Sequence, residues 1–477
     1  MASKLLALAL LSLFVYAAVG DRQSEKQQQR DRDFTQKCRL QRITRSQPSQ
    51  RFESEGGVTE IWDQDEDQFQ CAGFATMRHT VKPNSLSLPK FSPAPSLVYI
   101  EQGSGMLGIT IAGCPETFHS TEQGQRSRDV RSSGQQRDQH QKVRRFRKGD
   151  IIVAPAGAAS WCYNDGDEDV IAVTFHDLTN SENQLDWNLR EFMLAGGLPR
   201  QRMQERRREG RRGTQSQRVQ DTFQNVLRPF DQDLLSEALN VPSNIVQQMQ
   251  QEDNRGLIVR CEKEMMRMIS PEEEQEEGYE LEHPRGGRNL PQQNGMEETY
   301  CSMKFKTNMD ARRKSDFYGR GAGGINIVSE SKLPILQYLH LSAEKGHLMP
   351  NALFTPHWTV NEQTVFYTLR GEAQVQIVDH RGNTVMDERV KEGDMHVLPQ
   401  YYACVMRAGS EGYEWMAVKT SSRPEKSPMA GYTSVLRGMP NDVLANAFQI
   451  SPSEARQLKT NRDPQSLVLT PVGRISS

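Results

Sequence analysis

The residues of this chain best suited to chemistry are an Asn-Gly pair and a cysteine close to it. Asn294 and Gly295 precede Cys301 within the stretch LPQQNGMEETYC. In an exposed tract such a pair is open to proteolysis, whereas between two strands it would form a tight hairpin turn. A hairpin requires alternating strands on both sides, which PQQ and MEET do not supply. The pattern therefore favours an exposed tract around Asn294 that is open to proteolysis over a hairpin turn.

A second candidate site is the basic run RRREGRR at residues 206–212. Such a run could neutralise the phosphates of a nucleic acid. However, no aromatic side chain stands beside the arginines to stack on bases, and the whole chain has a net charge of −2. The run is predicted to be a solvated loop, and we expect no nucleic-acid partner.

The N-terminus has the pattern of a secretory signal. MASKLLALALLSLFVYAAVG combines a lone Lys4 with an apolar run and small residues before a cleavage point between Gly20 and Asp21. The run is short for a membrane span, and no later segment reaches about 18 apolar residues, so no membrane partner is expected. The mature chain should be soluble and begin near Asp21.

Composition indicates an exported, nitrogen-rich protein of more than one domain. The 477 residues favour two or three domains. All seven cysteines follow the signal, so they enter an oxidising compartment where disulfides persist, and their odd number leaves at least one unpaired. The chain has 42 Arg and 41 Gln against 17 Lys, which is more side-chain nitrogen than folding or solubility demands.

Short apolar runs predict an antiparallel β structure. Three polar tracts, residues 120–142, 199–219 and 271–294, lack apolar periodicity and are expected to be mobile loops. Short runs rich in Val, Ile, Tyr and Phe and separated by turn residues predict a sandwich or barrel. These runs are SLVYIEQGSGMLGITIAG, GDIIVAPAG, EDVIAVTF, TVFYTLRGEAQVQIVD, GDMHVLPQ and YEWMAVKT.

Two kinds of segment recur along the chain. DLLSEALNVP at residues 233–242 returns, with one extra residue, as DVLANAFQISP at residues 442–452. The proline in each falls where a second helix is expected to begin. GDIIVAP at residues 149–155 similarly matches GDMHVLP at residues 393–399. The repetition predicts a duplicated unit of a barrel followed by helices, with Asn294 and Gly295 between the copies.

Several stretches together closely resemble the 11S globulins, the legumin-type seed storage proteins of the cupin superfamily. They are SEGGVTEIWD, FQCAGFATMR, LVYIEQGSGMLGITIAGCPETF, GDIIVAPAGAASWCYNDGD, NGMEETYC, LPILQYLHLSAEKG and MAGYTSVLRGMP. The combination covers nearly the whole mature chain and is highly specific. It implies an all-β-dominated fold of two cupin barrels, in the double-stranded β-helix or jelly-roll form, each followed by a helical arm.

The resemblance also implies one cut after an asparagine by a vacuolar asparaginyl endopeptidase. The signal peptide would occupy residues 1–20. The cut would then divide the remaining chain into an acidic part, 21–294, and a basic part, 295–477. The acidic part would hold the first barrel at about residues 40–270 and a variable tail at 271–294, and the basic part the second barrel and arm. Charge agrees, because residues 21–294 have 37 Lys and Arg against 42 Asp and Glu, whereas the remainder has 21 against 19.

The family pattern assigns two disulfides. Cys114, in AGCPETF, would pair with Cys301 and join the two chains after the cut. Cys38 and Cys71 match a bridge within the acidic chain, and closing such loops typically adds about 2 to 4 kcal/mol by a model-dependent mechanism. Three cysteines remain, for which burial as small apolar residues is the simpler interpretation: Cys162, Cys261 and Cys404.

Many cupins are metalloenzymes, so the ligand positions of that pattern test an enzymatic role. In the first barrel the first three ligand positions fall on Pro89, Phe91 and Ser96. Ser160 takes the place of the last histidine, although the surrounding glycine and proline frame is kept. None of these side chains is a good ligand for the Mn or Fe ions that such sites hold.

The second barrel has few metal-ligating residues at the cupin ligand positions. Its ligand positions fall on His357, Thr359, Thr364 and Cys404, with Tyr401 where the motif has a glycine. One imidazole and at most one thiol fall short of the three or four protein ligands of a stable site. We expect His357 to be an ordinary packed or exposed histidine. The prediction is no metal, no cofactor and no catalytic site.

The resemblance therefore predicts a seed storage protein, a reservoir of nitrogen and carbon that is accumulated and later degraded. It implies passage through the endoplasmic reticulum to the protein storage vacuole, and homo- or hetero-oligomers with like subunits. These would be trimers of the precursor and hexamers after the cut, with arms near residues 220–250 and 440–460 making contacts. Allergenicity is a reasonable expectation for this family. A secreted cupin binding module and a degenerate cupin metalloenzyme are the alternatives.

Overall fold

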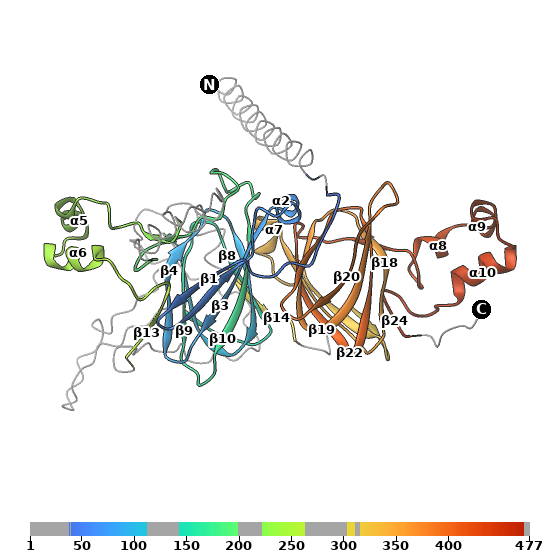
Figure 1. The fold of residues 1–477 in the computed structure, drawn as a ribbon, viewed down its shortest axis with the longest axis horizontal. Helices are drawn as coiled ribbons and strands as arrows, with labels where there is room; N and C mark the ends of the chain where they lie inside the picture. Colours follow the sequence, from blue (N-terminus) through green and yellow to red (C-terminus); the bar gives the residue numbers. More distant parts are fainter. Residues whose placement is uncertain are drawn as a thin grey trace, which may run out of the picture.

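The computed structural model describes residues 38, 40–111, 143–198, 222–262, 303–310 and 315–471. Within them the chain forms two β-barrels side by side, with short helices projecting at each outer end (Figure 1). This confirms the predicted fold of two jelly-roll barrels with helical arms. The three polar tracts lie outside the described residues.

The first barrel consists of two sheets packed face to face. One sheet contains, in spatial order, β1 (Gln50–Ser54), β2 (Gly57–Ile61), β3 (Phe74–Val81), β10 (Val170–Asp177), β5 (Ser96–Gln102), β8 (Asp150–Ala154) and β14 (Lys306–Asn308). The other contains β12 (Gln224–Asn225), β11 (Phe192–Met193), β4 (Ser85–Phe91), β9 (Ala159–Asn164), β6 (Ser104–Thr110) and β7 (Val143–Arg147), with β13 (Ile258–Arg260) beside β4. Alternate side chains of each strand point between the sheets, as the period of a strand requires.

The second barrel is formed by one ten-stranded sheet, in which β19 and β22 pair along most of their length. Its strands are β15 (Phe317–Gly319), β16 (Gly323–Val328), β17 (Ser342–Leu348), β18 (Leu353–Thr359), β19 (Thr364–Val378), β20 (Thr384–Lys391), β21 (Met395–Leu398), β22 (Ala403–Lys419), β23 (Lys426–Pro428) and β24 (Val468–Leu469). The expectation of short strands throughout is wrong here, because β19 has 15 residues and β22 has 17.

A glycine explains how these long strands bend without ending. Gly371 within β19 has φ of +73°, and a Cβ at this position would lie 2.3 Å from the carbonyl oxygen of Gly412 on β22. The pairing register of the two strands shifts beside it. Only glycine accepts both the left-handed backbone and the close approach.

The described helices are short, and side chains cap the N-termini of some of them. They are α2 (Asp67–Ala72), α5 (Gln232–Leu239), α6 (Ser243–Gln250), α7 (Leu336–Leu339), α8 (Val435–Gly438), α9 (Asn441–Phe448) and α10 (Pro452–Thr460). Asp231 caps α5, and Ser451 forms a capping box with Glu454 on α10. The predicted proline starts are confirmed, with Pro242 as the N-cap of α6 and Pro452 as the first residue of α10. None of the helices in the described ranges is long and apolar enough to cross a bilayer.

Two segments cross from one barrel to the other. Strand β14, from beyond the predicted cleavage point, adds to the edge of β8 in the first barrel. In the opposite direction, Leu40 and Ile43 are buried in the core of the second barrel, and the Ile43 amide donates to the carbonyl of Val385 at 2.8 Å. Each barrel is therefore completed by chain from the other half.

A buried polar cluster joins the facing sheets of the two barrels. The hydroxyl of Tyr367, which is fully buried, donates to Glu101 at 3.0 Å and accepts from the guanidinium of Arg78 at 3.3 Å. Arg78 also binds Glu60 at 2.7 Å. Because Glu101 is on the first barrel and Tyr367 on the second, these bonds fix how the barrels are oriented.

Replacing Tyr367 by Phe removes both inter-barrel hydrogen bonds and keeps the ring. Leaving the half-buried carboxylate of Glu101 short of a partner costs about 1–2 kcal/mol, so we expect the free energy of unfolding to fall by about that amount. Urea titration followed by tryptophan fluorescence measures it. Tyr401→Phe is the matched control, because that ring is 63% exposed and should tolerate the change. Equal unfolding midpoints for the two variants would contradict the assigned role.

Candidate functional site

The metal-ligand positions of the first barrel are occupied by side chains that cannot bind a metal. Phe91 on β4, Ser96 at the start of β5 and Ser160 on β9 line a cavity between the two sheets. The Phe91 ring stacks on Phe192 at a centroid distance of 5.0 Å. Three of the four predicted positions are thus brought together, as the cupin frame requires, and they supply an aromatic ring and two hydroxyls.

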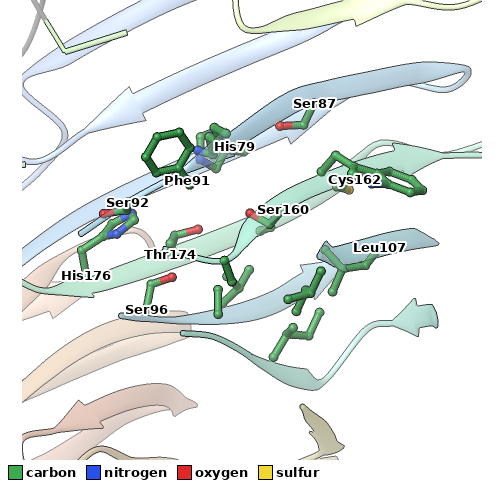
Figure 2. Close-up of a pocket in the computed structure, with 18 of the residues that line it drawn as sticks. His79, Ser87, Phe91, Ser92, Ser96, Leu107, Ser160, Cys162, Thr174 and His176 are labelled. Carbon is green, nitrogen blue, oxygen red and sulfur yellow. The ribbon is translucent and has the colours of Figure 1, made fainter. Parts of the chain in front are cut away.

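The cavity has a volume of about 100 Å³ and is apolar over most of its surface (Figure 2). Its apolar wall includes Phe91, Val98, Leu107, Ile109, Phe146 and Trp161. Small side chains leave the space open, because Ser96, Ser160 and Thr174 point into it where larger residues would fill it. Cys162 also lines the cavity, which explains why this cysteine is half-buried and not fully buried as expected.

A cluster of ionisable groups lies at the cavity. Glu191, adjacent to β11, forms an ion pair with the ammonium of Lys90 on β4 at a distance of 2.9 Å. Its other carboxylate oxygen lies 3.2 Å from Nε2 of His176 on β10. His79 on β3 contacts the hydroxyl of Thr59 through Nδ1 at 3.0 Å. All four charged or imidazole side chains line the cavity.

Burial keeps both imidazoles neutral at physiological pH. Burial lowers the pKa of His176 to about 4, although Glu191 opposes the shift. Burial also places the pKa of His79 well below its ordinary value, and Lys90 reinforces that shift. Nε2 of His79 and both ring nitrogens of His176 have no hydrogen-bond partner within the described chain, because the contact of His176 with Glu191 is an ion-pair distance without hydrogen-bond geometry. Buried imidazole nitrogens are therefore available to a molecule in the cavity.

The second barrel has lost its ligand set in a different way. His357, Thr359, Thr364 and Cys404 are all buried, and β18 places His357 directly opposite Cys404 on β22. The four positions are thus inside one barrel as predicted, whereas Tyr401 is exposed. We expected His357 to be a packed or an exposed histidine, and the structure shows it packed. Its Nδ1 contacts the carbonyl of Thr355 at 2.8 Å, and its ring stacks on Phe354.

A buried network of two lysines and two glutamates occupies the end of this barrel. Lys419 donates to Glu362 at 3.0 Å and to the hydroxyl of Thr364, a former ligand position, at 3.2 Å. Glu344 pairs with Lys426 and accepts from the indole of Trp415 at 3.1 Å. Burial alone would raise the pKa of Glu344, but the two ammonium groups hold it at about 2.

These surroundings do not fit a cation in either barrel. Burial and Lys426 hold the pKa of His357 at about 3, while burial raises the pKa of the Cys404 thiol, so the thiolate that metals bind is disfavoured. The ammonium group of Lys419 beside Thr364 would repel a metal ion. Among the described residues, no three His, Cys, Asp or Glu side chains are grouped to hold one.

The predicted processing residues lie largely outside the described ranges. Asn294, Gly295, Cys114, Cys301, Gly20 and Asp21 all fall there. Cys38 and Cys71, paired by the family pattern, form a disulfide with a Cα–Cα distance of 4.6 Å. Of the cysteines expected to be buried, Cys404 is buried, whereas Cys162 and Cys261 are half-buried; each of the three is a free thiol in the described part of the chain.

The ionisable cluster of the first barrel was not predicted. His79, Lys90, His176 and Glu191 come from four segments that are far apart in the sequence, and none belongs to a recognised motif. A weak signal existed, because His79 and His176 each stand in an apolar, β-branched run on the inward phase of a strand. Because the sequence does not show which strands pair or in what register, that signal cannot place the side chains around the same cavity.

Comparison with known proteins places these features in a family. The Cupin family model matches residues 44–206 and 309–456. The 11S globulin seed storage protein 2 of Sesamum indicum is 48% identical over 478 residues, which cover 99% of each chain. The crystal structure of the coconut allergen cocosin has a TM-score of 0.75 at 37% identity, over 91% of this chain and 100% of that one. An 11S globulin structure from Wrightia tinctoria, reported to reveal an auxin binding site, has a TM-score of 0.75 at 35% identity over 91% and 97% of the two chains.

The buried ion network gives a prediction for acid stability. Because the pKa of Glu344 is about 2 in the folded protein and about 4.3 in an unfolded chain, its carboxylate stabilises the fold above the unfolded pKa. That contribution is lost as the pH falls from about 4 towards 2. Glu344→Gln leaves Lys419 and Lys426 undercompensated, so we expect it to lower the free energy of unfolding by about 3 kcal/mol at pH 7.

The same substitution should also flatten the loss of stability between about pH 4 and 2, measured as urea midpoints across that range. Glu411→Gln is the control, because Glu411 is exposed and outside the network. If Glu344→Gln kept the wild-type pH dependence, the ion network would not be the source of the acid sensitivity.

Proposed function

Because the chain belongs to the 11S globulin family of seed storage proteins, we propose that it stores nitrogen and carbon for germination and has no catalytic role. The full-length similarity to a sesame storage globulin is the observation that carries the proposal. The 42 Arg and 41 Gln residues agree with it, because their side chains are rich in nitrogen. The unsuitability of both barrel interiors for a metal supports the absence of cupin enzyme chemistry.

Our proposal includes one proteolytic maturation step. A signal peptide ends at Gly20, and the precursor passes through the secretory pathway to the protein storage vacuole. An asparaginyl endopeptidase then cuts between Asn294 and Gly295, and a disulfide between Cys114 and Cys301 joins the acidic and basic chains. The charge difference between residues 21–294 and 295–477 supports this division, and the family pattern supplies the cysteine pairing.

The exchange of segments between barrels supports a product that stays assembled. Strand β14 follows the proposed cut, yet it pairs with β8, which precedes the cut. Leu40 and Ile43 precede the cut, yet they are buried in the second barrel. Both products of cleavage would therefore remain held by backbone hydrogen bonds and apolar contacts, in addition to any disulfide.

The helical arms support association of like subunits into trimers and hexamers. The arms lie at opposite ends of the molecule (Figure 1) and expose large apolar side chains. In the first arm Phe230 and Leu234 are 59% and 68% exposed, and in the second Val443 and Phe448 are 50% and 54% exposed. Amphipathic helices need to bury such faces, and a second copy of the chain is the partner that the family implies.

Small-molecule binding is a second candidate function, favoured by the cavity of the first barrel. The relative from Wrightia tinctoria is reported to have an auxin binding site. In this chain, the cavity lined by unpaired nitrogens of His79 and His176 is the observation that supports binding of a small aromatic molecule.

Asparaginyl endopeptidase should cut the precursor once, after Asn294. We expect two bands on a reducing gel and one band near the full mass without reductant. Asn294→Gln should prevent cleavage, because the protease recognises the asparagine side chain. Asn289→Gln, five residues earlier in the same tract, is the matched control and should be cut normally. Cleavage of the Asn294→Gln variant at the same place would overturn the assigned processing site.

A further inference from the structure

The first barrel contains buried hydrogen-bonding groups that the described protein does not use. His79 is 8% exposed and His176 is 3% exposed, and both line the cavity (Figure 2). Nε2 of His79 and Nδ1 of His176 have no hydrogen-bond partner among the described residues. Most buried polar atoms in proteins are paired, so an unpaired nitrogen at a cavity indicates that an occupant supplies the partner.

We propose that this cavity binds a small uncharged aromatic alcohol, such as a single-ring phenol, whose ring packs on the apolar wall and whose hydroxyl binds Nδ1 of His176. The proposal specifies the ligand class for the second candidate function and is independent of the storage role. A failure to bind phenols would leave the storage and processing proposals unaffected.

The hydrogen-bond roles at His176 select a ligand with a donor. Its Nε2 lies 3.2 Å from a carboxylate oxygen of Glu191 without forming a hydrogen bond to it, and the negative charge of that oxygen favours the proton on Nε2 over Nδ1. Burial holds the pKa of His176 at about 4, and the neutral ring then presents a bare lone pair at Nδ1. A phenol hydroxyl can donate to this atom, whereas a ligand with acceptors alone cannot.

The charge balance of the cluster disfavours an anion. The ammonium of Lys90 is already paired with Glu191 at 2.9 Å, and burial keeps both imidazoles neutral. A carboxylate ligand would bring a second negative charge close to Glu191 without a free cation to compensate for it. Buried charges that lack a partner are strongly disfavoured, so an uncharged head group fits better than an acid.

The dimensions of the cavity select a single ring. Its volume of about 100 Å³ compares with the roughly 150 Å³ of an apolar cavity that binds benzene. Phe91, Leu107 and Phe146 provide an apolar wall of the kind that aromatic rings pack on. The lining combines this apolar wall with the imidazoles of His79 and His176, so a ligand with an apolar body and one hydroxyl matches it.

Isothermal titration of the full-length protein with phenol, toluene and benzoate tests the proposal. Toluene replaces the hydroxyl by a methyl group of similar size, and benzoate adds a charge. We expect phenol to bind once per chain and about tenfold more tightly than toluene. One hydrogen bond can raise the affinity by up to about this factor. Benzoate should bind more weakly than both.

Three results would overturn the proposal. Equal affinity for phenol and toluene would show that the hydroxyl is not recognised, and tighter binding of benzoate would show that the site selects anions. No binding of any of these compounds would mean that the cavity holds water only.

A matched pair of variants assigns the effect to His176. His176→Phe keeps a ring but removes Nδ1, and should weaken phenol binding about tenfold while leaving toluene binding unchanged. His396→Phe is the control, because His396 is a buried histidine of the second barrel whose nitrogens also lack partners in the described chain. An equal effect of the two substitutions would contradict the assignment.

Crystals of the wild-type protein soaked with 4-bromophenol provide a test that no substitution can disturb. The anomalous signal of bromine should appear inside the first barrel, next to Phe91 and Leu107. A signal only elsewhere in the protein, or no signal, would overturn the proposed site even if His176→Phe failed to fold.

Discussion

The apolar face shared by the two barrels is the constraint on which the rest of the structure depends. Trp62 meets the Tyr367 ring edge-on at a centroid distance of 6.0 Å, and the Lys345 ammonium lies 5.3 Å from the centre of Tyr99. The facing strands of the second barrel are apolar on both sides, so a separated barrel would expose Val365, Met395, Val397, Met416 and Val418. Neither barrel is therefore suited to exist alone in water, and the two copies of the duplicated unit fold as one body.

The sequence predicts those features of the fold that depend on local patterns of residues, and it does not predict those that depend on tertiary contacts. Alternating apolar runs and the repeated helical segments predict the barrels and arms, because those patterns are local. Strand β14 could not be foreseen, since it has only three residues, Lys306–Asn308, and is polar. Its position at the edge of β8 is set by a tertiary contact. The sequence run TVFYTLRGEAQVQIVD covers the whole of β19, but only the end of β22 was predicted, as YEWMAVKT. Strands of this length were not expected because glycine usually signals a turn, whereas Gly371 here permits a bulge.

The crossing segments give the proposed maturation a physical basis. A cut in the tract between the barrels removes a covalent link but leaves β14 paired with β8 and Ile43 buried in the second barrel. The backbone hydrogen bonds of such a strand are satisfied only in the assembled fold, so dissociation would expose them together with apolar surface. Cleavage can therefore relieve a restraint on assembly without loosening the storage unit. Proteolysis that reaches the barrels themselves has to wait for other cuts or for unfolding.

The two interiors differ in the size of the side chains around the positions that hold a metal in other cupins. In the second barrel, Phe354 stacks on His357 at 4.2 Å and on Trp415 at 5.5 Å, and an ion network fills the adjoining end. The space is thus used by large side chains. In the first barrel, Ser96 and Ser160 stand at two of these positions and add little volume, although Phe91 occupies a third. A void beside small residues persists unless neighbours move inwards, and a well-packed interior resists such movement. The first barrel therefore retains a cavity, although both barrels have the cupin fold and neither fits a metal.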